Sequence, residues 1–98
     1  MNQFILVGKV IEEPIVQETI EGNKFSVFTI DSKRDKKNSD GVYESDVYKI
    51  TLYDSLAINL KDLLKLGSLT GIKGRISVDK AGVISLIGER VSVLERNS

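Results

Sequence analysis

The stretch DVYKITLYD, residues 46–54, alternates between two kinds of side chain. Successive side chains of an extended strand point to opposite faces, so the stretch has two distinct surfaces as a β-strand. One surface is apolar and suits a core: Tyr48, Ile50 and Leu52. The other is mixed: Val47, Lys49, Thr51 and Tyr53. A lysine and an aromatic ring on one half-wet face suit contact with something flat and negatively charged.

Short strand patterns dominate the rest of the chain. They cover residues 4–20 with an interruption at Pro14, and then 24–31, 46–53, 68–78 and 83–95. Apolar residues recur with helical spacing in SLAINLKDLLKLG (55–67), which predicts a helix. Residues 32–45 have no apolar periodicity and predict a long polar hairpin loop, whereas DKAG (79–82) predicts a tight turn.

Five strands with a helix between the third and the fourth is the element order of the OB-fold, a small, partly open barrel. Residues 4–20 count here as one bent first strand. The sequence therefore predicts an all-β protein with one helix, built as a single domain over residues 1–98. In such barrels, strands 2 and 3 and the connecting loops bind oligonucleotides or sugars. DVYKITLYD lies on that expected surface.

The composition restricts the chemistry that the chain can perform. It contains neither histidine nor cysteine, which removes the commonest general base, the commonest metal ligand and thiolate metal sites. The carboxylates show no metal-ligand spacing, and no phosphate-loop glycine pattern occurs. We expect a protein that is not an enzyme and that holds no metal and no cofactor.

The amino terminus, MNQFILVGKV, has an uninterrupted apolar run only over residues 4–7, with no basic residue before it. A signal peptide needs a longer run and a basic start, and a membrane span needs about 20 apolar residues. The lack of cysteine also suits a reducing compartment. We therefore expect a cytoplasmic protein that does not enter a membrane.

Charge is balanced in total but unevenly distributed. The chain has 14 Lys and Arg against 14 Asp and Glu, whereas a dedicated binder of polyanions is usually basic. The segment KRDKK (33–37) nevertheless holds four cations and one anion, while glutamates gather within residues 12–21. A basic segment between the two expected binding strands favours contact with nucleic acid.

Seven segments, in order and with the right spacing, resemble bacterial single-stranded DNA-binding proteins: NQFILVGKV (2–10), EP (13–14), FTI (28–30), the strand 46–53 running into LA (56–57), LKLGS (64–68), GRI (74–76) and ERVSVLE (89–95). The resemblance implies a barrel that binds single-stranded DNA with little sequence preference, in replication, recombination or repair. It also implies a homo-oligomer, tetramer or dimer, formed partly through the first strand. The candidate interface residues are Phe4, Leu6 and Tyr48.

The family's binding residues carry over unevenly. Tyr53 is the expected stacking ring and Tyr43 a replacement platform, and six cations would hold phosphates: Lys49, Lys73, Arg75, Arg34, Lys36 and Lys33. Val47 and Lys33 stand where many family members have tryptophan, and the hairpin 79–82 lacks the family's third ring. Stacking is worth roughly 1–3 kcal/mol per base, so we expect weaker binding that depends on phosphate contacts and falls steeply with salt.

The end of the sequence bears on which partners we expect. Family members usually carry a flexible tail with an acidic tip that recruits replication and repair enzymes. This sequence ends at LERNS, so we expect no such tail, as in an accessory or primosomal relative. The alternative is an OB-fold protein–protein adaptor or assembly module with a decayed DNA site. Zero net charge, the missing rings and the glutamates of residues 12–21 favour this alternative, whereas KRDKK and Lys73 favour DNA.

Overall fold

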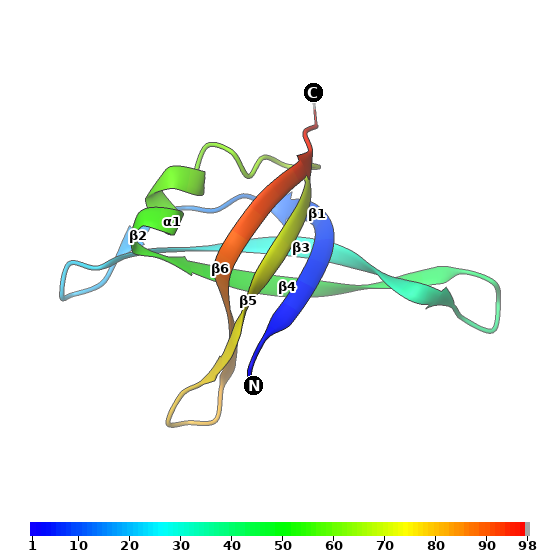
Figure 1. Ribbon diagram of the computed structural model, residues 1–98, viewed down its shortest axis with the longest axis horizontal. Helices are drawn as coiled ribbons and strands as arrows, with labels where there is room; N and C mark the ends of the chain where they lie inside the picture. Colours follow the sequence, from blue (N-terminus) through cyan, green and yellow to red (C-terminus); the bar gives the residue numbers. More distant parts are fainter. Residues whose placement is uncertain (98) are drawn as a thin grey trace.

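The computed structural model describes residues 1–97, which form strand segments and a short helix. In chain order these are β1 (Phe4–Glu12), β2 (Gln17–Glu18), β3 (Lys24–Lys37), β4 (Tyr43–Tyr53), α1 (Asp54–Leu60), β5 (Leu69–Val78) and β6 (Ile84–Glu95). The long strands β3 and β4 run side by side across the molecule, and β1, β5 and β6 cross them (Figure 1).

Strands β1, β5, β6, β4 and β3 follow one another as hydrogen-bonded neighbours, and β1 pairs again with β3, which closes a barrel. Strands β4 and β6 run parallel, and the other paired strands are antiparallel. The expected bent first strand is divided at the buried Pro14 into β1 and the short β2, which extends the sheet beyond β3. The helix lies between β4 and β5. The predicted OB-fold is confirmed.

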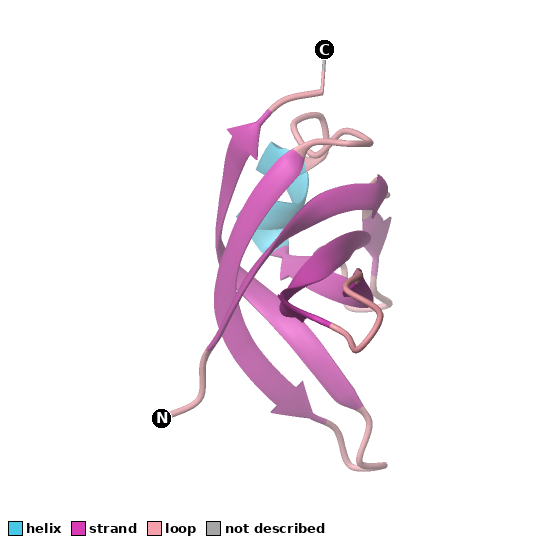
Figure 2. Cartoon of the chain, turned by 90° about the vertical axis from the view of Figure 1, so that its right-hand side faces the viewer, coloured by secondary structure: helices cyan, strands magenta, loops and turns pink. Residues whose placement is uncertain are grey.

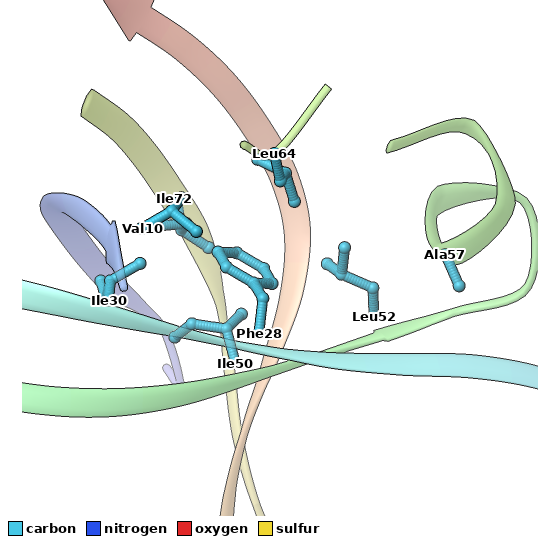
Figure 3. Packing of buried hydrophobic residues seen from close by; sticks show 8 residues of the cluster. All are labelled: Val10, Phe28, Ile30, Ile50, Leu52, Ala57, Leu64 and Ile72. Carbon is cyan, nitrogen blue, oxygen red and sulfur yellow. The ribbon is translucent and has the colours of Figure 1, made fainter. Parts of the chain in front are cut away.

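The core fills the barrel and continues under α1 (Figure 3). Its buried members are Val10, Phe28, Ile30, Ile50, Leu52, Ala57, Leu64 and Ile72. The contributions from β3 and β4 are all even-numbered, as the two-residue period of a strand requires. The apolar face predicted for DVYKITLYD is thus confirmed for Ile50 and Leu52, and Tyr48 packs half-buried against the same cluster.

Two glycines permit close contact between strands. A Cβ atom at Gly74 would collide with the carbonyl oxygen of Ile87 and would lie 2.8 Å from the Phe4 ring. A Cβ atom at Gly8 would lie 2.7 Å from the carbonyl oxygen of Asp31. Any larger residue would therefore push neighbouring backbones apart at these two points of the barrel.

The prediction of a long loop over residues 32–45 is wrong. Strand β3 continues to Lys37 and β4 begins at Tyr43, so the turn is confined to residues 38–42. Asn38 holds that turn, because its Oδ1 accepts hydrogen bonds from two backbone N–H groups. The two strands project from the barrel as a ribbon (Figure 1). Both faces of such a ribbon meet water, so its sequence needs no apolar alternation.

The predicted helix over residues 55–67 is too long, because α1 ends at Leu60. The chain then turns, and the side chain of Leu64 enters the core. The Glu13 carboxylate fixes this turn by accepting a hydrogen bond from the backbone N–H of Leu66 at 3.0 Å. The helix lies on the same side of the barrel as the C-terminus (Figure 2). Among residues 1–97, no helix has the length and apolar character needed to cross a membrane.

Candidate nucleic-acid interface

The pairing of β3 with β4 determines which side chains share a surface. Directly opposed residues of an antiparallel pair lie on the same face of the sheet. Within the barrel, even-numbered residues of the two strands point into the core, so the odd-numbered ones lie on the opposite face, which we call the outer ribbon face. Its members are Phe25, Val27, Thr29, Asp31, Lys33, Lys37, Tyr43, Ser45, Val47, Lys49, Thr51 and Tyr53.

Four of the predicted binding residues lie together on the outer ribbon face: Tyr53, Lys49, Lys33 and Tyr43. Both rings are accessible, with 45% of Tyr53 and 46% of Tyr43 exposed. The two tyrosines stand at opposite ends of β4, ten positions apart, which at roughly 3.3 Å per residue is about 33 Å. The face is therefore a long track with a ring at each end and lysines along it.

The outer end of the track combines a ring with two cations. The ammonium nitrogen of Lys33 lies 5.8 Å from the centroid of the Tyr43 ring, and that of Lys37 lies 5.6 Å away. Both distances fall within the range of cation–π contacts. A base stacked on Tyr43 would thus bring its phosphates close to two ammonium groups.

Arg34, also predicted to hold phosphate, points to the other side of the ribbon. Its Nε and Nη2 donate to the two carboxylate oxygens of Asp46 at 3.0 and 2.9 Å, and its Nη1 donates to Glu44 at 3.0 Å. The hydrogen bond to Asp46, together with the two negative charges, raises the pKa of the Arg34 guanidinium. The same hydrogen bond lowers the pKa of the Asp46 carboxyl group. Arg34 is thus already paired within the ribbon.

The remaining predicted cations lie off the regular part of the outer ribbon face. Lys36 is exposed in the irregular stretch between the paired Lys33 and Lys37. Lys73 and Arg75 lie on β5, where Arg75 approaches Glu89 at 3.7 Å. The structure therefore distributes the predicted phosphate contacts over four places: the outer ribbon face, its opposite side, the irregular stretch of β3 and strand β5.

The candidate interface residues Phe4, Leu6 and Tyr48 are partly buried and pack against the protein's own core. The exposed side of β1 instead presents Ile5, 69% exposed, and Val7, 47% exposed. Leu94 of β6 joins them, because its side chain covers the space above Gly71, the residue that pairs with Val7. We call Ile5, Val7 and Leu94 the β1 outer patch.

A hollow of about 1060 Å³ separates β1 from the projecting ribbon. Its lining includes Ile5 and Val7 of the β1 outer patch, Lys9 of β1, and Asp31, Lys33 and Tyr43 of the outer ribbon face. The hydroxyl of Ser32 donates a hydrogen bond to the carbonyl oxygen of Val7 at 2.8 Å and so ties the two strands together there. The hollow connects the two surfaces.

Sequence reasoning did not name three residues of this region as binding residues, although one of them, Lys37, lies within the basic segment KRDKK. Lys37 and Phe25 belong to the outer ribbon face, and Phe25 sits directly opposite Tyr53. Extending the two-residue alternation along residues 24–37 would have identified both. Lys9 reaches the region only through its pairing with Asp31, which joins segments far apart in sequence. No local pattern signals that contact.

Comparison with known proteins identifies the family. Residues 1–95 match the model of the single-strand binding protein family. Single-stranded DNA-binding protein 3 of Listeria innocua is 30% identical over 97% of this chain, which spans 64% of that relative. Single-stranded DNA-binding protein 1 of Clostridium acetobutylicum is 29% identical over 97% of this chain, which spans 94% of that relative.

Solved structures agree in fold. The mitochondrial single-stranded DNA-binding protein of S. cerevisiae superposes with a TM-score of 0.80 at 19% identity, covering 99% of this chain and 97% of the other. A deletion mutant of the single-stranded DNA-binding protein from Thermus aquaticus gives 0.76 at 21% identity, covering 97% of this chain and 51% of the other. The barrel, the register and the family match lead to one conclusion: this chain belongs to the single-strand binding protein family.

Proposed function

We propose that this protein binds single-stranded DNA along the outer ribbon face, in replication, recombination or repair in the cytoplasm. The observation that carries the proposal is that exposed Tyr43 and Tyr53 share one strand face with Lys33, Lys37 and Lys49. Binders of single strands combine a basic track for the backbone with rings on which bases stack. Membership in the family supports this function over that of a protein adaptor with a decayed DNA site.

The residues take different roles in this proposal. Tyr53 and Tyr43 stack bases, and the lysines between and beside them hold phosphates. Arg34 contributes little to phosphate binding in this arrangement, because a phosphate must displace two carboxylates to reach it. Lys73 and Arg75 would receive a strand that leaves the ribbon toward β5, and Lys36 would serve one that passes the tip.

The proposal predicts how steeply the binding constant falls with salt concentration. Each phosphate contact to a single strand contributes about −0.7 to the slope of log K against log salt concentration. Lys33, Lys37 and Lys49 together then give a slope of about −2 for each chain. Val47 offers no ring in the middle of the track, so the affinity should depend on these contacts more than on stacking.

We also propose that the protein forms a homo-oligomer, a dimer or a tetramer, through the β1 outer patch. Three exposed aliphatic side chains gather there on the barrel strands, and a second copy of the chain would remove them from water. Replacing Val7 by Glu should shift the sedimentation coefficient toward that of a monomer. An unchanged coefficient would place the interface elsewhere.

The test of DNA binding is fluorescence anisotropy with a labelled oligo-dT of about 35 nucleotides, long enough for several binding sites. We expect binding at low salt that weakens steeply as salt is added, and a marked loss in Lys49→Ala. Lys65→Ala is the control, because it removes the same charge from a residue outside β3 and β4. Failure of the wild-type protein to bind at low salt would refute the proposal and favour a protein partner.

A further inference from the structure

We propose that Asp31 makes the outer ribbon face prefer bases that carry an exocyclic amino group over thymine and uracil. The inference rests on the proposed binding of single-stranded DNA and adds a chemical preference to it. It starts from one pair in the register: Asp31 of β3 lies directly opposite Val47 of β4.

Val47 and Asp31 are directly opposed, so one base can contact both side chains. Val47 is 61% exposed and presents an apolar surface to a base plane. Directly opposed residues of an antiparallel pair have Cβ atoms about 4.5–5.5 Å apart. A base that lies on Val47 therefore has its edge within reach of the Asp31 carboxylate.

The Asp31 carboxylate is free to receive a donor. Three other carboxylates nearby are engaged, since Arg34 holds Asp46 and Glu44, and Thr29 donates to Glu12 at 2.6 Å. Asp35 lines the same hollow but lies outside the regular pairing of β3 with β4. Among residues 1–97, none of the side-chain hydrogen bonds and ion pairs involves the Asp31 carboxylate. Asp31 is only half-buried and lines the hollow between β1 and the ribbon.

Three lysines surround this carboxylate, so positive and negative groups lie side by side on this surface. Lys9 is paired with Asp31 across β1, Lys33 lies two positions along β3, and Lys49 lies diagonally across on β4. Phosphates go to the lysines, because a carboxylate repels them. The group that approaches Asp31 must then come from the base and must donate a hydrogen bond.

Bases differ in what they offer at that position. Cytosine N4, adenine N6 and guanine N2 are amino groups, and aspartate is a known acceptor for cytosine N4. Thymine and uracil place the carbonyl oxygen O4 where cytosine has its amino group. Their remaining N3–H donor sits between two carbonyl oxygens that repel a carboxylate. The site therefore selects against these two bases.

The test compares oligo-dC with oligo-dU, whose pyrimidine rings are alike in shape and differ in the group at C4 and the proton at N3. The measured quantity is the ratio of the two Kd values, dU over dC, from anisotropy at one salt concentration. We expect this ratio to be about fivefold larger for the wild-type protein than for Asp31→Asn, whose amide can donate to O4. Intrinsic differences between the two strands cancel in this comparison of ratios.

Asp35→Asn is the matched control, because it removes the same charge from the same hollow at a position outside the regular pairing. It should tighten both strands alike and leave the ratio unchanged. Equal ratios in the wild type and a folded Asp31→Asn, or an equal change of ratio in Asp35→Asn, would overturn the inference while leaving DNA binding intact. Failure of the wild type to bind either strand would overturn the proposed function itself.

Discussion

Removal of the tyrosines measures how much stacking the protein retains. Tyr53 is 45% exposed and lies opposite Phe25, so its ring is available to a base and is not needed to fill the core. Base–aromatic stacking is worth roughly 1–3 kcal/mol, which corresponds to about fivefold to 150-fold in Kd. We expect Tyr53→Ala to weaken binding of an oligo-dT within this range and Tyr53→Phe to weaken it little.

The distance along β4 predicts how two such losses combine. Tyr43 and Tyr53 are about 33 Å apart at roughly 3.3 Å per residue, so they stack different bases. Changes at separate sites more than about 10 Å apart usually add in free energy. The double variant Tyr43→Ala, Tyr53→Ala should therefore lose the sum of the two single losses, provided that the strand spans the ribbon.

Anisotropy with a labelled oligo-dT of about 20 nucleotides measures the wild type and the four variants. That length exceeds the roughly ten nucleotides that cover 33 Å even at the ~3.4 Å spacing of fully stacked bases. Thermal melts followed by circular dichroism check that each variant folds. A double variant no weaker than either single one would show that the rings do not act as separate platforms. An equal loss in Tyr53→Phe and Tyr53→Ala would show that stacking is not the cause.

Three further predictions concern the ribbon and the barrel. Asp46→Asn should release Arg34 toward phosphate and steepen the salt slope by up to about 0.7, which anisotropy at several salt concentrations measures. The hydrogen bond from Arg34 lowers the pKa of Asp46. The ion pair should therefore stabilise the fold fully at pH values above the ordinary aspartate pKa, and this contribution should be lost as the pH falls through the lowered pKa of Asp46. An NMR titration of the Asp46 carboxyl group measures this. Gly74→Val should lower the melting temperature sharply, since even a Cβ collides with the Ile87 carbonyl, whereas Gly71→Ala should be tolerated because its nearest neighbour lies at an ordinary 3.5 Å.

The barrel was predictable because each of its strands has a buried side. The alternation in DVYKITLYD, with Ile50 and Leu52 turned inward, reports a core on one face and water on the other. The same alternation places Lys49 and Tyr53 together on the opposite face without any tertiary information. Where one face of a strand is buried, the alternation of apolar and polar residues shows which side chains lie on each face.

The projecting part of the ribbon and the end of the helix were not predictable for the same physical reason. Residues 33–37 and 43–45 are exposed on the projecting part of the ribbon, so no buried face imposes a period on them. Leu64 follows a helical spacing from Leu60 and does enter the core, but it arrives there through a turn. The spacing of apolar residues therefore indicates which residues contact the core, but it does not determine whether the backbone there is a helix or a turn.

The face of the strand on which a residue lies also determines which of the predicted site residues lie together. Arg34 and Lys33 are neighbours in sequence, yet Arg34 meets Asp46 and Glu44 while Lys33 approaches Tyr43 on the other face. Phe4 and Leu6 alternate with Ile5 and pack inward, which leaves Ile5 exposed. Composition and family likeness pointed to segments of the chain, whereas the parity of each strand position determines which side chains within a segment share a face.

Zero net charge does not argue against a polyanion partner once the charges are assigned to faces. Arg34 forms ion pairs with Glu44 and Asp46 on one side of the ribbon. These three charges therefore do not contribute to the charge of the opposite side. The outer ribbon face is left with lysines and a single aspartate. A basic track therefore exists on a neutral protein, and the aspartate within it is the group through which a binder with little sequence preference could still distinguish one base from another.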